Sequence, residues 1–539
     1  MKKTFDYIII GAGSAGCVLA NRLIKDKKTT VCLLESGPKS NTWKVDMPSA
    51  LLYTMHDSKY NWKYYSEPEP YLNNRRIFCP RGKMIGGCSS HNGMVFVRGN
   101  PLDFERWASY GLPKWSYKNV LPYFKKLETW SGGENLYRGG KGPLKVNRSK
   151  IDEAFPLFKS LIKAAAEAGY DTFEDSNGFK QDGFGTFDVT IDNGKRQGVS
   201  RAYLNEVKGY KNLLIEHNTD VSKIIFKEKK AIGVEIRRDN NSEIYYCNKE
   251  IILSSGSINS PKILQLSGIG DEKTLSQNGI DIINHLPGVG KNLQDHLEIY
   301  IQHKSKIKDT LYNLSTNYFT QAVEGIKWFL FKKGMLTYSH LEAGGFVKTS
   351  ETYKHPNIQL HFFPSLVINH GLTNPSFDGF QFHASPNRPK SRGFVEIKSN
   401  NYLEVQSGPK YSIPFLFDRS SPISYNLVVS FPEKQEYVLS GIIGVATLSF
   451  MLTLVIVVIS TSALYQIIQQ KKLSEIKNDF INNISHEFKT PIATINLALD
   501  AISSSKNSLN EKFTSYLDMI REENSRMLSQ VENILRISQ

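Results

Sequence analysis

The pattern of apolar and polar positions divides the chain into parts with different periods. Residues 7–10 and 31–34 are short aliphatic runs, as buried parallel strands show, and a helix-like segment lies between them. From residue 481 onward, apolar side chains instead recur every three or four positions, as on one face of an α-helix. Between these parts, residues 438–464 carry no charged side chain. The pattern therefore predicts an α/β part, an apolar segment and an all-α part, in this order.

The turn after the first strand is spaced for a dinucleotide. Gly11, Gly13 and Gly16 permit, in turn, a tight bend, a close approach of a pyrophosphate to the backbone, and close packing of helix on strand. The N-terminus of the helix then faces the phosphates with free N–H groups. Glu35 ends the second strand, about 20 residues on, where an acid can accept a hydrogen bond from a ribose hydroxyl. The segment predicts a dinucleotide site, with FAD and NAD as alternatives.

Composition narrows the class of protein. A chain of 539 residues is too long for one core and predicts several domains. The net charge is +15, but the lysines are scattered and no basic run alternates with aromatics, so we expect a solvated basic surface and no nucleic-acid partner. The five cysteines form no Cys-x-x-Cys pair, which predicts a reduced, cytoplasmic type of protein without a metal site. The first apolar run ends at Gly11, too early for a signal peptide.

The middle of the α/β part predicts further strands and turns. Asn193-Gly194 predicts a hairpin turn. The apolar runs at residues 213–216, 224–226 and 231–236 predict strands, and a helix is expected to begin near Pro261.

A second glycine-rich loop lies at residues 80–100. Gly86 and Gly87 precede small residues, and Asn92-Gly93 continues the loop, so that a ligand can contact the backbone there. Taken alone, an ordinary turn is the alternative.

Residues 82–99 resemble the first signature of the glucose–methanol–choline (GMC) oxidoreductases, FAD-dependent enzymes that oxidise alcohols. The run GGCSSHN at residues 86–92 is similar to that of a subset, including choline oxidase-like proteins, in which the histidine is bonded covalently to the flavin. The resemblance thus implies FAD and leaves two roles for His91, a covalent link or packing beside the isoalloxazine ring. The FAD-binding residues implied in all are Gly11, Gly13, Gly16, Glu35, Gly86, Gly87, His91, Asn92, Gly93 and, through a backbone contact to the adenine, Val221.

The resemblance extends to residue 401. Residues 256–270 match the second GMC signature, and residues 341–346 are similar to the choline dehydrogenase branch. This implies an α/β Rossmann-type FAD-binding domain with an α+β substrate domain in residues 1–401, and a small alcohol such as choline as substrate. Aromatic side chains are dense between residues 300 and 383, and aromatic faces with one carboxylate suit a quaternary ammonium. Glu342 is the candidate carboxylate; alternatively, the aromatics are core and Glu342 lies on the surface.

The resemblance stops before the residues that would complete the reaction. In the family, a histidine near the C-terminus removes the alcohol proton while hydride passes to the flavin. No similar segment follows Asn401, and His361, His370 and His383 lie in the substrate-domain part and do not replace it. We therefore expect the catalytic base to be missing, which leaves open whether the chain is an active enzyme.

The segment after residue 401 predicts a membrane protein. Residues 402–437 have no clear period and are interpreted as an extracytoplasmic-type linker, and residues 438–465 are long and apolar enough for a transmembrane helix. Lys471, Lys472 and Lys477 follow the apolar run, which places the C-terminus in the cytoplasm by the positive-inside rule. This single-pass topology conflicts with the flavin domain, which has no export signal and a cytoplasmic composition.

Residues 466–539 predict a helical hairpin. Two stretches with helical periodicity, residues 481–502 and 513–534, are separated by a turn at residues 503–510. Such a hairpin would form a four-helix bundle as a homodimer.

His486 lies two residues from Ile484 and from Phe488, about 200° around the helix from either, so it faces away from the apolar seam. Residues 480–492 resemble the phosphoacceptor box of sensor histidine kinases. The resemblance implies that His486 accepts a phosphoryl group, that Glu487 positions it, that Thr490 serves the reverse phosphatase step, and that a response regulator is a partner. The ATP-binding domain and first membrane helix of such kinases are not found in the sequence.

Three hypotheses remain open. The chain is a choline-type FAD alcohol oxidoreductase, or a membrane phosphorelay sensor with a flavin domain, or a non-functional fusion of two gene fragments.

Overall fold

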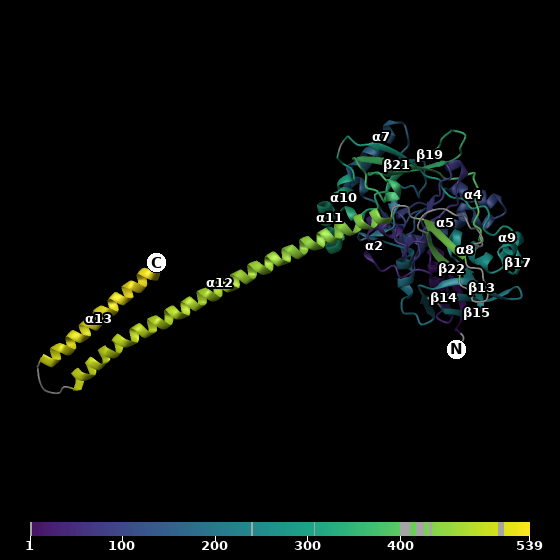
Figure 1. Ribbon diagram of the computed structural model, residues 1–539. Coiled ribbons are helices and arrows are strands. Elements are labelled where there is room, and N and C mark those ends of the chain that lie inside the picture. Colours follow the sequence, from purple (N-terminus) through teal and green to yellow (C-terminus); the bar gives the residue numbers. More distant parts are fainter. Residues whose placement is uncertain are drawn as a thin grey trace. The chain divides into compact units, whose positions relative to one another are not determined.

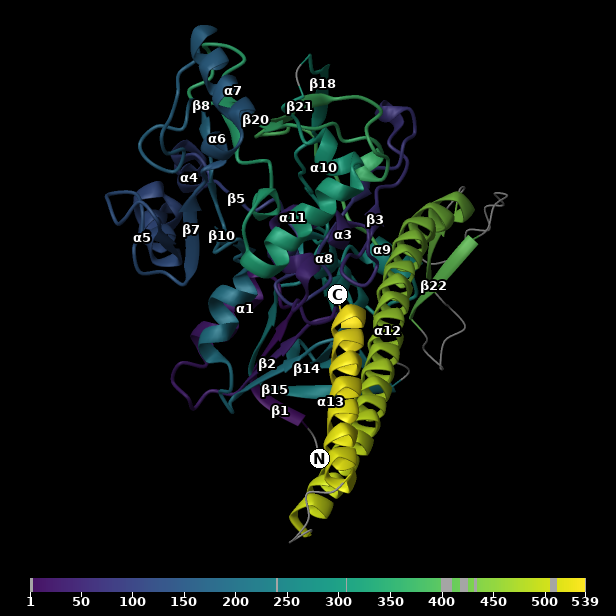
Figure 2. The same ribbon diagram turned by 90° about the vertical axis from the view of Figure 1, so that its left-hand side faces the viewer.

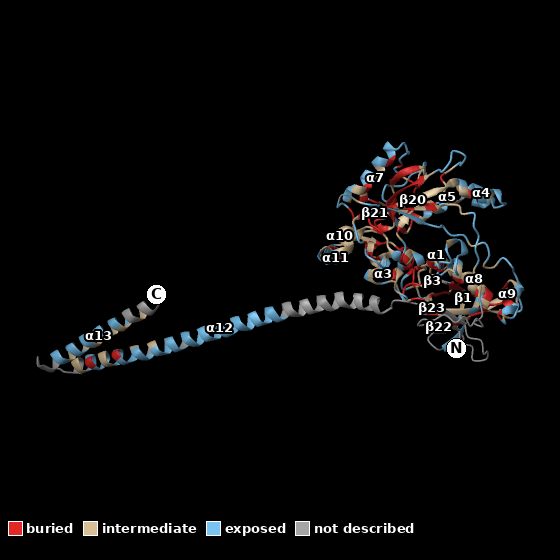
Figure 3. Cartoon of the chain, turned by 45° about the horizontal axis from the view of Figure 1, so that its top comes forward, coloured by how far each residue is buried: buried red, intermediate tan, exposed pale blue. Residues whose placement is uncertain are grey.

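The computed structural model describes residues 3–238, 241–306, 308–398, 410–416, 425–430, 434–504 and 511–538. The chain divides into two compact units, one from residues 1–404 and 414–427 and one from residues 405–413 and 428–539. Nearly all buried residues among those described belong to the first unit, whereas most described side chains of the second are exposed (Figure 3).

A six-stranded sheet forms the base of the first unit (Figure 1). Its strands, in spatial order, are β12 (Leu213–Glu216), β2 (Val31–Leu34), β1 (Lys3–Ile10), β15 (Asn241–Leu253), β14 (Lys230–Arg238) and β13 (Asp220–Lys227). The first four are parallel, and β14 and β13 continue the sheet as an antiparallel meander. The predicted strands at residues 7–10, 31–34, 213–216, 224–226 and 231–236 all lie in this sheet.

Both faces of the sheet are apolar because β2 and the last three residues of β1 are unbroken apolar runs. Ile9 and Leu33 point to one face, where they pack with Cys17 and Ala20 of helix α1 (Ser14–Leu23). Ile8, Ile10, Cys32 and Leu34 point to the other, which helix α8 (Gly256–Leu266) covers with Ile263. This is the predicted Rossmann-type arrangement, with the strand–helix turn at the carboxyl end of β1.

Helix α8 begins earlier than predicted. It starts at Gly256 and contains Pro261 in its interior, whereas the sequence predicted a start near the proline. The chain turns at Gly256, whose φ is +80°, so the helix can begin at once. Pro261 then costs one backbone hydrogen bond inside the helix.

A second, antiparallel sheet lies at the opposite end of the first unit (Figure 2). Its order is β18 (Ile299–Lys304), β21 (Gly379–Pro386), β20 (Ile358–Phe363), β19 (Ala343–Val347) and β8 (Gly183–Thr186). Helices α6 (Ile151–Ala154) and α7 (Pro156–Glu167) pack on it through a core of Ile151, Phe158, Ala343 and Phe362. It supplies the predicted α+β part.

Smaller elements join the two sheets. A four-stranded sheet contains β5 (Val95–Phe96), β9 (Asp188–Val189), β7 (Leu144–Arg148) and β6 (Glu128–Trp130). The hairpin of β10 (Ile191–Asp192) and β11 (Lys195–Arg196) turns at Asn193-Gly194, both with positive φ, as predicted. The other helices and strands of the unit are α2 (Trp43–Asp46), α3 (Leu51–Met55), α4 (Pro101–Ser109), α5 (Tyr117–Leu127), α9 (Glu272–Gln277), α10 (Tyr312–Thr316), α11 (Tyr318–Phe331), β3 (Tyr64–Tyr65), β4 (Phe78–Cys79), β16 (Ile269–Gly270) and β17 (Asn284–His285).

The second unit contains the predicted helical hairpin. Helix α12 (Lys434–Ser504) is followed by α13 (Glu511–Ser538), and the two lie side by side (Figures 1 and 2). Ala498 is 1% exposed between them, and Gln530 Nε2 donates to Glu487 Oε2 at 2.8 Å. Residues 505–510, which hold most of the predicted turn, lie outside the described residues.

The predicted membrane segment requires a correction. Residues 438–465 lie within α12, and the side chains of residues 438–456 are outside the described part of the chain. Among the residues that the structure describes, no helix is long and apolar enough to cross a bilayer. The prediction of a single-pass membrane protein with a cytoplasmic C-terminus is therefore wrong. Hydropathy had suggested it because an uncharged run reports only how apolar a segment is, and this run is part of a longer helix with charged residues from Lys471 on.

The predicted linker at residues 402–437 lies partly outside the described residues. In its described portion, β22 (Lys410–Leu416) and β23 (Tyr425–Ser430) form a two-stranded sheet.

Candidate functional site

The first glycine loop has no space for side chains where helix α1 meets β1. A Cβ on Gly16 would lie 2.0 Å from Gly11 O, and Gly11 itself has a φ of +99°. A Cβ on Gly13 would instead meet nothing closer than Ser254 O, at 4.0 Å. The loop therefore leaves no room for a side chain at Gly11 or Gly16, whereas at Gly13 there is space beside the backbone. Gly13 is also the N-cap of α1 and supplies no side-chain cap, so the first N–H groups of the helix are available to an anion.

Glu35 fixes the backbone of this loop. Its Oε2 accepts the Ala12 N–H at 3.0 Å and its Oε1 accepts the Gly37 N–H at 2.9 Å. The side chain is almost fully buried, and burial raises the pKa of its carboxyl to about 7. Each oxygen keeps a second lone pair, so the predicted contact to a ribose hydroxyl is sterically and chemically compatible with these bonds.

The second glycine loop contacts the first directly. The Gly86 N–H donates to Ala12 O at 2.7 Å, and a Cβ on Gly87 would lie 2.8 Å from Gly13 Cα. Gly86 and Gly87 have φ values of +94° and +53°. The fold thus brings together two glycine runs that are more than 60 residues apart in the chain, as a cofactor held between them requires.

His91 follows the second loop and is 6% exposed. Its Nδ1 has no hydrogen-bond partner. Burial, helped by the positive charges of Arg196 and Arg81, lowers the pKa of the imidazole to about 4, so the ring is neutral at pH 7. A neutral, buried ring with a free nitrogen fits either role expected for this residue.

Arg196, which the sequence did not single out, holds the His91 loop in place. Its Nη1 donates to Asn92 O at 2.6 Å and to Asn92 Oδ1 at 2.9 Å, and its Nε donates to Val45 O at 3.0 Å. Burial lowers the pKa of its guanidinium to about 9, which leaves the group cationic at neutral pH. An arginine after a hairpin turn carries no motif that would have revealed this role.

Ser254, just after β15, also contacts the first loop, because it donates its hydroxyl to Gly11 O at 2.9 Å. Val221, the predicted backbone contact to the adenine, lies on β13 and is paired with Ile236 of β14. β13 is the edge strand of the sheet that contains β1.

Glu342 is fully buried at the start of β19, so the alternative placement on the surface is wrong. Its Oε1 accepts the Ser339 N–H at 2.7 Å, while its Oε2 has no partner. Burial raises the pKa of this carboxyl to about 7. The neighbouring Leu341 adjoins the second glycine loop, because a Cβ on Gly93 would lie 2.9 Å from Leu341 Cδ1.

A row of residues in register crosses the second sheet, and three of its four members have polar side chains. Tyr300, His383, His361 and Gly344 are paired in register on successive strands. His383 Nδ1 lies 3.3 Å from Glu298 Oε1, and the Tyr300 and His383 rings are 4.4 Å apart. Sequence patterns could not predict that these residues share a row, because strand register is a tertiary property.

The second candidate site lies on the hairpin. His486, Glu487 and Thr490 are all exposed on α12, while Ile484 and Phe488 are partly buried. Thr490 Oγ1 lies 3.5 Å from His486 O, one turn earlier. The predicted orientation of His486 away from the apolar seam is confirmed. In the described residues of both units, no group of three or more His, Cys, Asp or Glu is arranged to hold a metal ion.

Comparison with known proteins agrees with this geometry. Residues 5–298, which contain both glycine loops, match the family model for GMC oxidoreductase, and residues 476–539 match the His Kinase A (phospho-acceptor) domain. The chain belongs to the GMC oxidoreductase family. Its C-terminal helices belong to a phospho-acceptor domain.

Relatives of the GMC part include choline dehydrogenases. The chain is 43% identical to the oxygen-dependent choline dehydrogenase of Vibrio vulnificus over 416 residues, which cover 77% of this chain and 74% of the relative. It is 42% identical to the mitochondrial choline dehydrogenase of Mus musculus over 407 residues, 74% of this chain and 68% of the relative.

Solved structures show the same fold. A formate oxidase of Aspergillus oryzae superimposes with a TM-score of 0.68 at 25% identity, over 74% of this chain and 75% of that one. An FAD-dependent oxidoreductase from Chaetomium thermophilum gives 0.63 at 27% identity, over 72% and 75%. GMC oxidoreductases use FAD, and the two contacting glycine loops with an open face above Gly13 are the features of this chain that fit it.

Proposed function

We propose that the GMC part binds FAD between its two glycine loops and is built for the oxidation of a small, choline-like alcohol. The contact of the Gly86 N–H with Ala12 O carries the first half of this proposal, because it places the free N-terminus of α1 beside the second loop. The N–H groups of that helix would hold the pyrophosphate, and Glu35 would accept a hydrogen bond from the ribose. Bound FAD would supply the acceptor for the hydride of the alcohol carbon.

His91 is the proposed covalent link to FAD. The ring is neutral at pH 7, since its pKa is about 4, and Nδ1 is not used by any described residue. Any flavin that the protein retains should then stay with the denatured wild-type chain as fluorescence on a gel, and His91→Ala should lose this fluorescence. Cys88→Ser is the control, because the Cys88 thiol is exposed in the same loop. Loss with Cys88→Ser would assign the link to the thiol instead.

Glu342 is the proposed partner of the substrate cation. A fully buried carboxylate with one free oxygen is costly unless a cation or a proton compensates it. A quaternary ammonium would supply that charge. Choline is an alcohol of this kind, and relatives of this chain are named choline dehydrogenases. Because the pKa of Glu342 is about 7, choline affinity should rise with pH up to about 7 and then level off. Glu342→Gln should abolish this pH dependence.

We propose further that the chain lacks the catalytic base of the family, so that alcohol oxidation should not proceed. A histidine suits general-base catalysis when its pKa is near the working pH. Burial lowers the pKa values of His91 and His340 to about 4, which makes both weak bases. Residues 476–539 are phospho-acceptor sequence and supply no GMC segment in its place.

The test is a flavin titration of the purified full chain. If the segment that closes the family's FAD domain is missing, as we propose, FAD binding should be weak. Choline added without oxygen should then not bleach the flavin. A protein that carries stoichiometric FAD and oxidises choline would overturn the proposal.

The hairpin carries a second candidate function, a phosphorelay. His486 is exposed and can receive a phosphoryl group from a kinase in trans, and Glu487 and Thr490 flank it on the same helix. Ile492 and Leu499 are 47% and 49% exposed in the single chain, as expected if a second copy completes a four-helix bundle. Incubation with a partner kinase and labelled ATP should label the chain, and His486→Gln should remove the label. A response regulator would be the receiver.

The third hypothesis, a fusion of two gene fragments, is tested separately. One uninterrupted transcript read across codons 395–445 would establish that the chain exists as written, and its absence would establish an artefact.

A further inference from the structure

A cavity of about 250 Å³ lies in the first unit and shares no lining residue with the glycine loops. Residues 98–102, 176–182 and 354–355 form its walls, together with Tyr117 at the start of α5. Residues 98–102 connect β5 to α4 and include the start of that helix. Residues 176–182 precede β8, and residues 354–355 lie between β19 and β20. The volume is slightly below the range for drug-sized ligands, so only a smaller molecule would fit.

Three side chains that line this cavity have polar atoms without a hydrogen-bond partner, namely Arg98, Ser176 and His355. Arg98 and Ser176 are 5% and 4% exposed. Arg98 Nε and Ser176 Oγ have no hydrogen-bond partner. Buried polar groups are nearly always paired, so each orphan requires an explanation.

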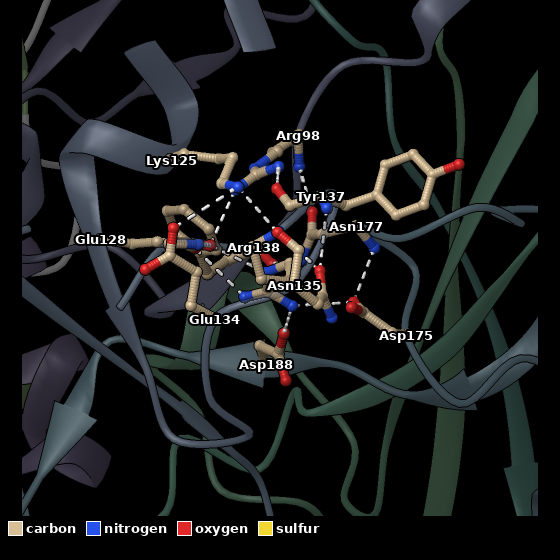
Figure 4. Close-up of polar contacts among 12 residues, drawn as sticks. Arg98, Lys125, Glu128, Glu134, Asn135, Tyr137, Arg138, Asp175, Asn177 and Asp188 are labelled. Atoms are coloured by element: carbon tan, nitrogen blue, oxygen red, sulfur yellow. Dashed lines mark hydrogen bonds and ion pairs between the residues drawn. The ribbon is translucent and has the colours of Figure 1, made fainter. Parts of the chain in front are cut away.

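Arg98 cannot turn away to find another acceptor. Its Nη2 donates to Glu128 Oε1 at 2.7 Å and its Nη1 donates to Tyr137 O at 2.6 Å (Figure 4). Asn177 Oδ1 accepts the Arg98 backbone N–H at 2.7 Å, and Glu128 is itself held by Arg138 at 2.9 Å. The orphaned Nε–H is therefore fixed by this network before any ligand arrives.

The charges that line the cavity leave an excess of one positive charge. Glu128 compensates Arg98, Asp171 lies 3.0 Å from Lys180, and Lys348 lies 3.4 Å from Asp182, the acidic residue of the lining.

Lys354 makes no ion pair with any residue that the structure describes. The carbon atoms of Pro101, Leu102 and Phe179 supply apolar wall beside these polar groups. Excess positive charge, two orphaned donors and apolar wall together favour an organic anion over an inorganic one.

We propose that this cavity binds a small carboxylic acid in its ionised form. The carboxylate oxygens accept the Arg98 Nε–H and the Ser176 hydroxyl, Lys354 balances the charge, and the short carbon chain contacts Leu102 and Phe179. The inference does not depend on the FAD site, since no lining residue is shared with it.

The test is a titration of the full chain with sodium butyrate, followed by saturation-transfer NMR at constant ionic strength, with FAD present in excess. Wild type should give a saturable signal. Ser176→Ala and Lys354→Met should each weaken binding at least tenfold. Lys163→Met is the matched control, because Lys163 lies on the exposed face of α7 and its side chain is 76% exposed.

Two outcomes would overturn the proposal: no saturable signal above that in sodium chloride, or equal binding by Lys354→Met and Lys163→Met. Displacement of butyrate by inorganic phosphate at lower concentration would overturn the assignment to a carboxylic acid. Thermal unfolding of each variant confirms that the fold is retained, since Lys354 is exposed on a loop.

Discussion

The glycine loops and the histidine hairpin present their functional groups in opposite ways. In the loops, the groups that would meet a ligand are backbone N–H donors, and side chains are excluded by contacts such as the 2.0 Å between a Gly16 Cβ and Gly11 O. On the hairpin, the functional group is an exposed imidazole that projects from a regular helix. The first site therefore depends on tertiary packing at each residue, whereas the second depends on a helix and little else.

This contrast predicts a large effect for Gly16→Ala. The new methyl group would meet the backbone of Gly11 in the turn, which cannot rotate away, so we expect a loss of at least about 3 kcal/mol of unfolding free energy or failure to fold. The variant should also lose FAD binding. Thermal unfolding measures the loss of stability, and flavin fluorescence measures the loss of FAD binding.

Gly325→Ala is the matched control. Gly325 also lies inside a helix, α11, and a Cβ there meets nothing within 4 Å. It should stabilise the protein by roughly 0.5–1 kcal/mol through helix propensity. If the two variants behaved alike, close packing of Gly16 would not be what the first loop requires.

Buried carboxyls give the next largest effect. The pKa of Glu342 is raised from 4.5 to about 7 in the folded chain, so the folded state holds this proton more tightly than the unfolded state. The contribution of protonated Glu342 to the unfolding free energy is fully present below pH 4.5 and is lost as the pH rises to about 7. The unfolding free energy should fall by roughly 3 kcal/mol over this range. Denaturant unfolding from pH 4.5 to 8 measures it.

Glu342→Gln should flatten part of this dependence. Glu35 has a similarly raised pKa of about 7 and should account for the part that persists. An unchanged pH dependence in the variant would show that Glu342 is not the titrating group.

Gln530→Ala tests the hairpin and should have a small effect. It removes the 2.8 Å bond to Glu487, which is exposed, so we expect at most about 1 kcal/mol. Circular dichroism on heating measures it. A larger loss would mean that the hairpin depends on specific tertiary contacts after all.

His486→Gln should have the smallest effect on stability. An exposed side chain without a side-chain partner among the described residues predicts a change within about 0.5 kcal/mol. Phosphoryl labelling, in contrast, should disappear completely. A destabilised variant would leave the loss of label without a chemical interpretation.

The sequence by itself determined the local parts of both sites. The aliphatic runs of β1 and β2 and the spacing of Gly11, Gly13 and Gly16 specified the strand, turn and helix, because each depends on neighbours in the chain. The three- and four-residue periodicity likewise specified the hairpin and the outward direction of His486. The same kind of evidence was misleading for residues 438–465, where apolar composition predicted a membrane span that the described helices do not support.

Only the tertiary structure decided how distant residues meet. Three features each bring together residues from different strands and loops. They are the contact between Gly87 and Gly13, the hydrogen bond from Arg196 to Asn92, and the complete burial of Glu342. The pKa values of Arg196 and Glu342 follow from their burial, since desolvation is set by what surrounds a group in space. A one-dimensional pattern records periodicity and spacing, and it carries no measure of the atoms that remove water from a side chain.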